Sequence, residues 1–121
     1  MSESCPFCKS EFYLENTTCY ARLDLYPVSE GHTLVIPKRH VATWFDMSLQ
    51  EQTDAMTLVA EARDYLSTKY VTNDFNIGVN CGVVAGQTVP HAHVHLIPRY
   101  KGDMADPKGG VRGVIPDKQK Y

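Results

Sequence analysis

Three histidines alternate with apolar residues in the segment from His91 to Ile97. Residues two apart in a β-strand point to the same face, so the alternation predicts a strand with His91, His93 and His95 on one face. The residues between them, which would face a core, are Ala92, Val94 and Leu96. The chain is therefore expected to build a sheet with one face packed on a hydrophobic layer.

Other segments predict the elements around this strand. Alternation over residues 18–24 and an apolar stretch over 32–36 predict two strands joined as a long-looped hairpin, and residues 75–80 predict a third strand. Ser48 to Glu51 matches a capping box, and apolar residues then recur at three- and four-residue intervals to about Lys69. The order strand, strand, helix, strand, strand indicates an α+β fold with the helix on one face of the sheet.

The chain has 121 residues and a formal charge of −2, which fits one domain. We expect residues 1–100 to form this domain and residues 101–121 to be an irregular tail of the same domain. No apolar run exceeds three residues, which argues against a membrane-spanning helix or signal peptide, so we expect a cytoplasmic protein. The near-neutral charge argues against a broad nucleic-acid-binding surface, and no nucleic-acid partner is expected.

Two kinds of chemistry use several histidines on one face. The first is a catalytic zinc with three protein ligands and a nearby carboxylate base, and the second is attack of a neutral imidazole on phosphorus. Gln87 and Thr88, just before the strand, supply an amide and a hydroxyl that suit a phosphoryl group. No acidic residue lies between Asp74 and Asp103, so the sequence favours phosphorus chemistry.

Cys5 and Cys8 form a Cys-x-x-Cys pair near the start of the chain. In a chain without an export signal, such a pair indicates metal or redox chemistry more often than a structural disulfide. A redox motif needs a strand just before it, and there is no room for one here. Zinc binding then requires two further ligands from elsewhere, and two simple thiols remain the alternative.

Several motifs together resemble the histidine triad family. The segment His91–Ile97 fits its signature, and the flanking residues, with segments 31–38 and 76–80, are also similar to the family. The resemblance implies a histidine triad fold, with a five-stranded antiparallel sheet, one long helix and a short N-terminal helix in each subunit. It also implies a homodimer and hydrolysis or transfer at the α-phosphate of a nucleotide.

The resemblance assigns roles to the residues that match the family's motifs. It implies that His93 is the nucleophile and that its other ring nitrogen donates to a fixed acceptor, expected to be a backbone carbonyl. The implied catalytic partners are His95, His32, Gln87 and Thr88. The implied nucleotide-binding residues are Asp24 for the ribose, with Asn80, Gln87, Thr88 and His95 near the phosphates. Candidates for the base pocket are Phe7, Leu23 and Leu25.

The resemblance also bears on the Cys-x-x-Cys pair. Family members with this motif bind a structural zinc, and the matching positions here are Cys5, Cys8, His40 and His91. Four protein ligands would close the tetrahedral site and leave no position for substrate. We therefore expect one structural zinc per subunit.

Together these features predict a homodimeric hydrolase that acts on a small nucleotide. It would cleave dinucleoside polyphosphates or nucleoside phosphoramidates through a nucleotidyl-histidine intermediate and release a nucleoside monophosphate. The tail segment 109–116 resembles bacterial members grouped with dinucleoside polyphosphate hydrolases. The alternatives are a catalytically weak nucleotide-binding regulatory module and a nucleotidyl transferase. A zinc-dependent nucleic-acid-binding domain is disfavoured, because only Lys9 is basic near the cysteine pair.

Overall fold

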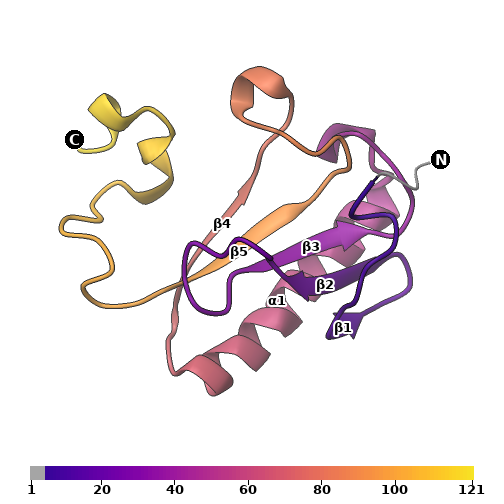
Figure 1. The fold of residues 1–121 in the computed structure, drawn as a ribbon, viewed down its shortest axis with the longest axis horizontal. Coiled ribbons are helices and arrows are strands. Elements are labelled where there is room, and N and C mark those ends of the chain that lie inside the picture. Colours follow the sequence, from indigo (N-terminus) through magenta and orange to yellow (C-terminus); the bar gives the residue numbers. More distant parts are fainter. Residues whose placement is uncertain (1–4) are drawn as a thin grey trace.

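The computed structural model describes residues 5–121 and shows a five-stranded antiparallel sheet with one long helix across one face (Figure 1). The strand order is β1-β2-β3-β5-β4. The elements are β1 (Leu14–Glu15), β2 (Cys19–Leu23), β3 (Thr33–Pro37), α1 (Leu49–Tyr70), β4 (Asp74–Val79) and β5 (Val94–Arg99). This arrangement confirms the predicted α+β class. Among the described residues, no helix combines the length and apolarity needed to cross a membrane.

Helix α1 begins where the capping box predicts. The Ser48 hydroxyl accepts a hydrogen bond from the Glu51 amide at 3.1 Å, and the Ser48 amide donates to the Glu51 carboxylate at 2.8 Å. These two bonds satisfy backbone donors that a helix start otherwise leaves unpaired. The helix ends at Tyr70, and the next residue, Val71, adopts a left-handed conformation with φ of 54°.

The strand register divides the sheet into two faces. Ala21 pairs with Val35, which pairs with Val94, and all three side chains are buried against α1. In the next register row, Leu34 lies between Arg22 and His95. Because side chains alternate along each strand, this second row occupies the face opposite the helix. The sheet therefore packs its main core against α1 on one face, and on the other it carries His95 and a smaller buried cluster of Phe7, Tyr20, Leu34 and Ile36.

The predicted hairpin and the strand over 75–80 are confirmed within one residue at each boundary. The histidine strand needs a correction, because β5 begins only at Val94. Before that point the Ala92 amide donates to the Val41 carbonyl at 2.7 Å, outside the sheet ladder. The predicted start of the strand is therefore wrong, but the alternation holds: Ala92, Val94 and Leu96 pack into the core under the helix, and His91 and His93 both contact Phe7 on the other face.

The two ends of the chain also differ from expectation. Among residues 5–13 the structure has a turn and no helix, so the short N-terminal helix is not found in this described part. The tail is not wholly irregular, because it forms two 3₁₀ helices, η3 (Gly110–Val114) and η4 (Pro116–Lys118). The tail lies on the β4 side of the sheet, where η3 contacts that strand (Figure 1). The remaining 3₁₀ helices are η1 (Trp44–Asp46) and η2 (Val83–Ala85).

Candidate functional site

A pocket of about 260 Å³ lies beside the histidines on the face opposite the helix. Its walls combine apolar side chains with a few polar ones, as small-molecule sites usually do. The lining residues are Pro6, Phe7, Arg22, Asp24, Leu25, Tyr26, Leu34, Thr88, Val89 and His93. The pocket thus joins His93 to Asp24, which are far apart in the sequence.

His93 is held with one ring nitrogen bonded to the main chain. Its Nδ1 lies 2.8 Å from the carbonyl oxygen of His91, and a carbonyl can only accept, so Nδ1 carries the proton. In the neutral ring, Nε2 is then left with its lone pair. The ring is 8% exposed and meets the edge of Phe7 at 4.9 Å between centroids. His93 has the tautomer that a nucleophile requires, and the carbonyl partner is the kind expected from the sequence.

His95 is held through His32. The Val28 amide donates to His32 Nδ1 at 3.1 Å, so the proton of neutral His32 is on Nε2. That Nε2 lies 3.0 Å from His95 Nδ1 and 3.5 Å from an Asp24 carboxylate oxygen. Since His95 accepts at Nδ1, its own proton is on Nε2. The two neighbouring histidines, whose centroids are 5.2 Å apart, therefore offer opposite groups at Nε2: a lone pair on His93 and an N–H on His95.

Burial keeps the supporting histidines neutral. Desolvation, with the adjacent His93 and His32, lowers the pKa of His95 to about 4, although Asp24 acts in the opposite direction. Desolvation also lowers the pKa of His32, again against the effect of Asp24. Both rings are therefore uncharged at neutral pH, which the hydrogen-bond chain through them requires.

Asp24 is fixed at the end of β2 and lines the pocket. One carboxylate oxygen accepts from the Tyr26 amide at 2.9 Å, and the other lies 3.5 Å from His32. A carboxylate oxygen has two lone pairs, so both retain acceptor capacity for a hydroxyl group. The site places Asp24 where it can bind a vicinal diol next to His93.

The remaining residues that were predicted to bind the nucleotide differ in whether they reach the pocket. Thr88 lines the pocket, and Asn80 lies one residue after β4, outside the lining. The side-chain amide of Gln87 is bonded to three backbone groups: it accepts from the Gly82 amide at 2.8 Å and donates to the carbonyls of Ala42 and Val89 at 2.6 and 3.0 Å. Gln87 therefore shapes the loop between β4 and β5, and its contact with phosphate stays a prediction.

Of the base-pocket candidates, Phe7 and Leu25 line the pocket, whereas Leu23 lines a separate hollow with Glu11 and Phe12. Other wall residues were not predicted: Pro6, Arg22, Tyr26, Leu34 and Val89. Two of these could have been found from register, because Arg22 and Leu34 share the row that contains His95. The others come from loops, whose path no periodic pattern predicts.

Behind the pocket, Cys5, Cys8, His40 and His91 form a second cluster whose ligand atoms all lie within 4.8 Å of one another. His91 Nδ1 is 3.4 Å from Cys5 Sγ, and His40 Nδ1 is 3.1 Å from Cys8 Sγ. The two Nδ1 atoms are 3.2 Å apart. The structure thus brings together the four residues that the resemblance implies for zinc.

These four donors fit a closed zinc site. With zinc–nitrogen and zinc–sulfur bonds of about 2.0 and 2.3 Å, a tetrahedron separates its ligand atoms by about 3.3 to 3.8 Å, close to the distances observed. His91 Nε2 donates to the Pro37 carbonyl at 2.8 Å, which turns Nδ1 toward the cluster. Zinc-binding histidines commonly fix the non-ligating nitrogen in this way.

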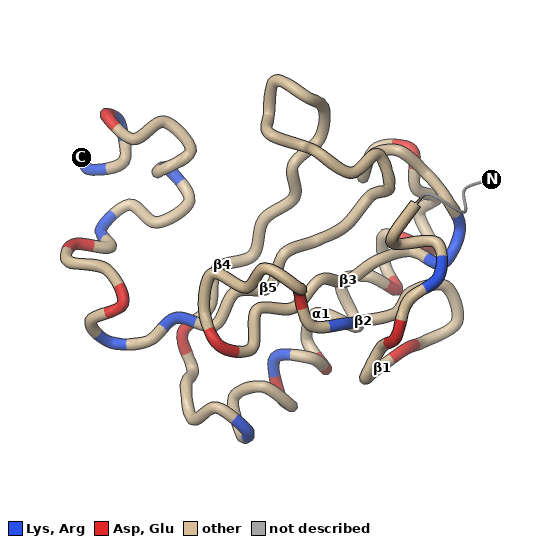
Figure 2. The backbone as a smooth tube through the Cα atoms, in the orientation of Figure 1, with Lys and Arg blue, Asp and Glu red and all other residues tan. Residues whose placement is uncertain are grey.

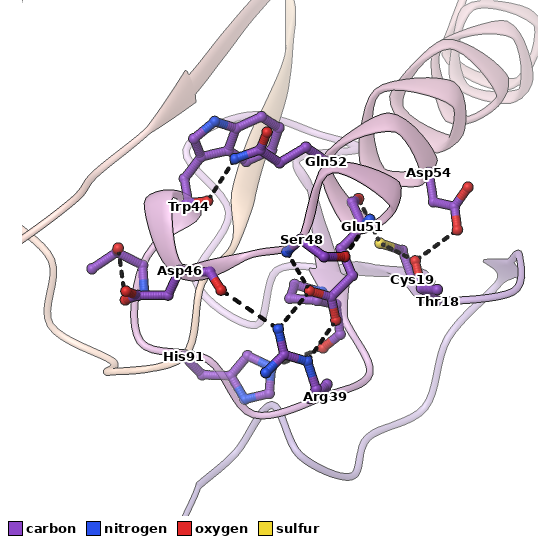
Figure 3. A network of polar contacts seen from close by, with 12 residues as sticks. Thr18, Cys19, Arg39, Trp44, Asp46, Ser48, Glu51, Gln52, Asp54 and His91 are labelled. Carbon is purple, nitrogen blue, oxygen red and sulfur yellow. Dashed lines mark hydrogen bonds and ion pairs between the residues drawn. The ribbon is translucent and has the colours of Figure 1, made fainter.

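An ion pair supports the segment that carries His40. The adjacent Arg39 donates from Nε and from a terminal nitrogen to the two carboxylate oxygens of Glu51, at 2.9 and 2.8 Å (Figure 3). The Glu51 side chain is buried, and the Arg39 hydrogen bonds lower its pKa. Glu51 also caps helix α1, so one carboxylate ties the metal cluster to the start of the helix.

Charged residues are distributed unevenly around the pocket. No Lys, Arg, Asp or Glu occurs between Asp74 and Arg99, and Figure 2 shows the uncharged loop that joins β4 to β5. The charged side chains that line the pocket are therefore Arg22 and Asp24, both from the β2 side.

A family model described as the HIT domain matches residues 8–102. The bis(5'-nucleosyl)-tetraphosphatase (asymmetrical) of Schizosaccharomyces pombe is 39% identical over 97 residues, covering 80% of this chain and 53% of that protein. The chain therefore spans about half the length of this relative.

Two solved structures are similar along most of their length. A HIT family protein from Bacillus anthracis matches with a TM-score of 0.78 and 30% identity over 98% of this chain and 91% of that one. A zinc-bound histidine triad family protein from Mycobacterium smegmatis matches with a TM-score of 0.73 and 31% identity over 88% and 82%. On the agreement of family match, fold and histidine arrangement, the chain belongs to the HIT domain family, the histidine triad proteins.

Proposed function

We propose that the protein is a nucleotide phosphohydrolase that cleaves dinucleoside polyphosphates or nucleoside phosphoramidates at the α-phosphate. The observation that carries this proposal is the hydrogen bond from His93 Nδ1 to the His91 carbonyl, because it leaves an unprotonated Nε2 at the wall of the pocket that holds Asp24. The name of the yeast relative, a nucleosyl tetraphosphatase, supports this substrate class.

In the proposed reaction, the base and ribose lie in the pocket, with the ribose hydroxyls donating to Asp24. His93 Nε2 attacks the α-phosphorus, and the departing group takes the electron pair of the bond that breaks. A departing phosphate leaves as its anion, and a departing amine takes a proton from solvent. His95 Nε2–H donates to a phosphate oxygen as charge moves onto it. Water then attacks the phosphorus, its oxygen replaces His93 Nε2, and the proton that it loses passes to solvent. This releases the nucleoside monophosphate and restores neutral His93.

The proposal includes one zinc per subunit at Cys5, Cys8, His40 and His91. The donor set supports zinc, because two thiolates with two imidazoles are typical of structural zinc sites. Zinc bound there would supply a rigid cross-link between the N-terminal turn, the segment that follows β3 and the segment that precedes β5. It would leave the phosphorus chemistry to the histidines.

We also propose a homodimer. Strand β4 is six residues long, lies at the end of the strand order, and exposes Ile77. The loop after it exposes Val83 and Val84. A long edge strand with apolar neighbours favours pairing with another chain. Sedimentation equilibrium tests this: two chains per particle are expected, and a monomer at all accessible concentrations would exclude it.

Activity is tested with a panel of diadenosine polyphosphates and adenosine phosphoramidates, with products separated by chromatography. Release of AMP by the wild type, with loss of that release in His93→Ala, is the expected result. Quenching under alkaline conditions should trap adenylyl-protein in the wild type alone. Binding without turnover would support a regulatory module, and transfer to an added nucleotide in preference to water would support a transferase.

A further inference from the structure

The two residues between the metal-binding cysteines line the nucleotide pocket. Pro6 and Phe7 both belong to its wall. Phe7 is 8% exposed, and its ring lies 4.9 Å from that of His93 and 6.2 Å from that of His91. One short turn therefore contributes ligands on one side and a pocket wall on the other.

This turn has few other restraints. Residues 5–13 contain no helix or strand, so no backbone ladder fixes the position of Phe7. The Phe7 carbonyl accepts from the Tyr20 hydroxyl at 2.6 Å, and the Phe7 side chain packs with Leu34 and Ile36. Bonds from Cys5 and Cys8 to a metal would restrain the backbone on both sides of Phe7.

A second connection passes through His91. Its ring belongs to the metal cluster, and its backbone carbonyl accepts the hydrogen bond from His93 Nδ1. Movement of His91 would therefore displace the acceptor that orients His93. The pocket is in contact with the metal cluster through two independent routes, a packed ring and a backbone hydrogen bond.

We infer that zinc at this cluster and a nucleotide in the pocket strengthen each other's binding, with Phe7 as the positioning residue that couples them. The inference rests on the proposed nucleotide site. Coupling between two binding sites is reciprocal, so AMP must tighten zinc by the same factor by which zinc tightens AMP. The expected factor is at least about fivefold, the lower end of usual coupling.

The test measures the zinc dissociation constant by competition with a chromophoric chelator, with and without saturating AMP. It is run at a temperature at which circular dichroism shows that the zinc-free protein keeps its helix. Calorimetric titration of AMP into zinc-loaded and zinc-free protein gives the reciprocal factor. Zinc affinity that does not change with AMP would overturn the coupling, although AMP binding itself would leave the proposed function standing.

Two matched variants identify the route. Phe7→Ala keeps all four metal ligands and His93, and it should lower the factor to the part that the His91 carbonyl alone transmits. Leu25→Ala removes another apolar pocket wall that is not attached to a ligand, and it should weaken AMP while keeping the factor. Equal factors in the two variants would overturn the role of Phe7, and would indicate that AMP and zinc are linked only through general stability of the fold. Failure of AMP to bind the wild type would instead remove the proposed function.

Discussion

His91 and His93 are two residues apart, and each has one ring nitrogen bonded to a backbone carbonyl, but they use opposite nitrogens. His91 donates from Nε2 to Pro37 and turns Nδ1 toward two thiols and a second imidazole. His93 donates from Nδ1 to His91 and leaves Nε2 at the pocket. The nitrogen that contacts the main chain thus differs between the two residues, and the other nitrogen faces the four-donor cluster in His91 and the pocket in His93.

The largest effect is expected from removing the proposed nucleophile, His93, alone. His93→Ala should lower turnover by about three orders of magnitude or more, because the covalent route is lost. Its zinc content should stay at the wild-type level, since no ligand is changed. Steady-state kinetics with metal analysis of the same sample measures both. Turnover close to wild type would exclude His93 as the nucleophile.

The reverse experiment removes a metal ligand. Cys8→Ala should lose zinc, and a metal present at a thousand times its dissociation constant contributes about 4 kcal/mol to folding. For a chain of this size, the Tm should fall by roughly 10 °C or more. His32→Ala is the control, because it removes a histidine from the pocket side and should keep zinc. A metal-free wild type with unchanged Tm would contradict the structural role.

The third prediction tests whether Asp24, on the pocket side, binds the ribose. Asp24→Ala, or a 2′-deoxy substrate with the wild type, should lower kcat/KM by roughly tenfold to a hundredfold, since each removes a charge-assisted hydrogen bond. Combining both changes should cost little more than one, because they remove the same contact. The measurement compares kcat/KM for wild type and Asp24→Ala, each with the ribose and the 2′-deoxyribose substrate. If the two losses multiply, Asp24 does not contact the ribose and the assignment is wrong.

The smallest effect concerns pH and separates His95 from the metal ligands. The pKa of His95 in the folded protein, about 4, lies below the ordinary value of 6.5. Between pH 4 and pH 6.5 the unfolded chain therefore binds more protons than the folded protein. Stability should therefore fall as pH falls, by about 1 kcal/mol between pH 7 and 5.5. Denaturant unfolding of zinc-loaded wild type and His95→Asn measures this, because the metal ligands contribute equally to both. An unchanged pH dependence in the variant would show that His95 is not kept neutral by the fold.

The fold was largely predictable because its main elements carry local signals. The Ser48 capping box and the apolar stripe that follows predict α1 at both ends, alternation predicts β2, and an apolar stretch predicts β3. Strand β1 has only two residues, too few for a pattern, and was expected only from the resemblance. The start of β5 was wrong because alternation does not show where the ladder ends, and here Ala92 bonds to Val41 outside the sheet.

The candidate site was predictable in its chemistry and less so in its shape. The histidines and Asp24 follow from motif positions, and the structure brings them together. The role of the Gln87 amide in holding the loop depends on backbone groups of Gly82, Ala42 and Val89, which no side-chain pattern reveals. The pocket walls come from β2, β3 and three separate loops, so their assembly depends on tertiary packing.

The bond that fixes His93 has a consequence for how this protein can change by mutation. Its acceptor is a main-chain carbonyl, and no side-chain substitution deletes a main-chain carbonyl. The tautomer of His93 is therefore inherited by every variant that keeps the path of the backbone. His95 has no such protection, because its tautomer depends on the side chain of His32. Random mutagenesis should thus change the tautomer of His95, the proposed hydrogen-bond donor to phosphate, more readily than that of His93, the proposed nucleophile, which changes only when the backbone moves.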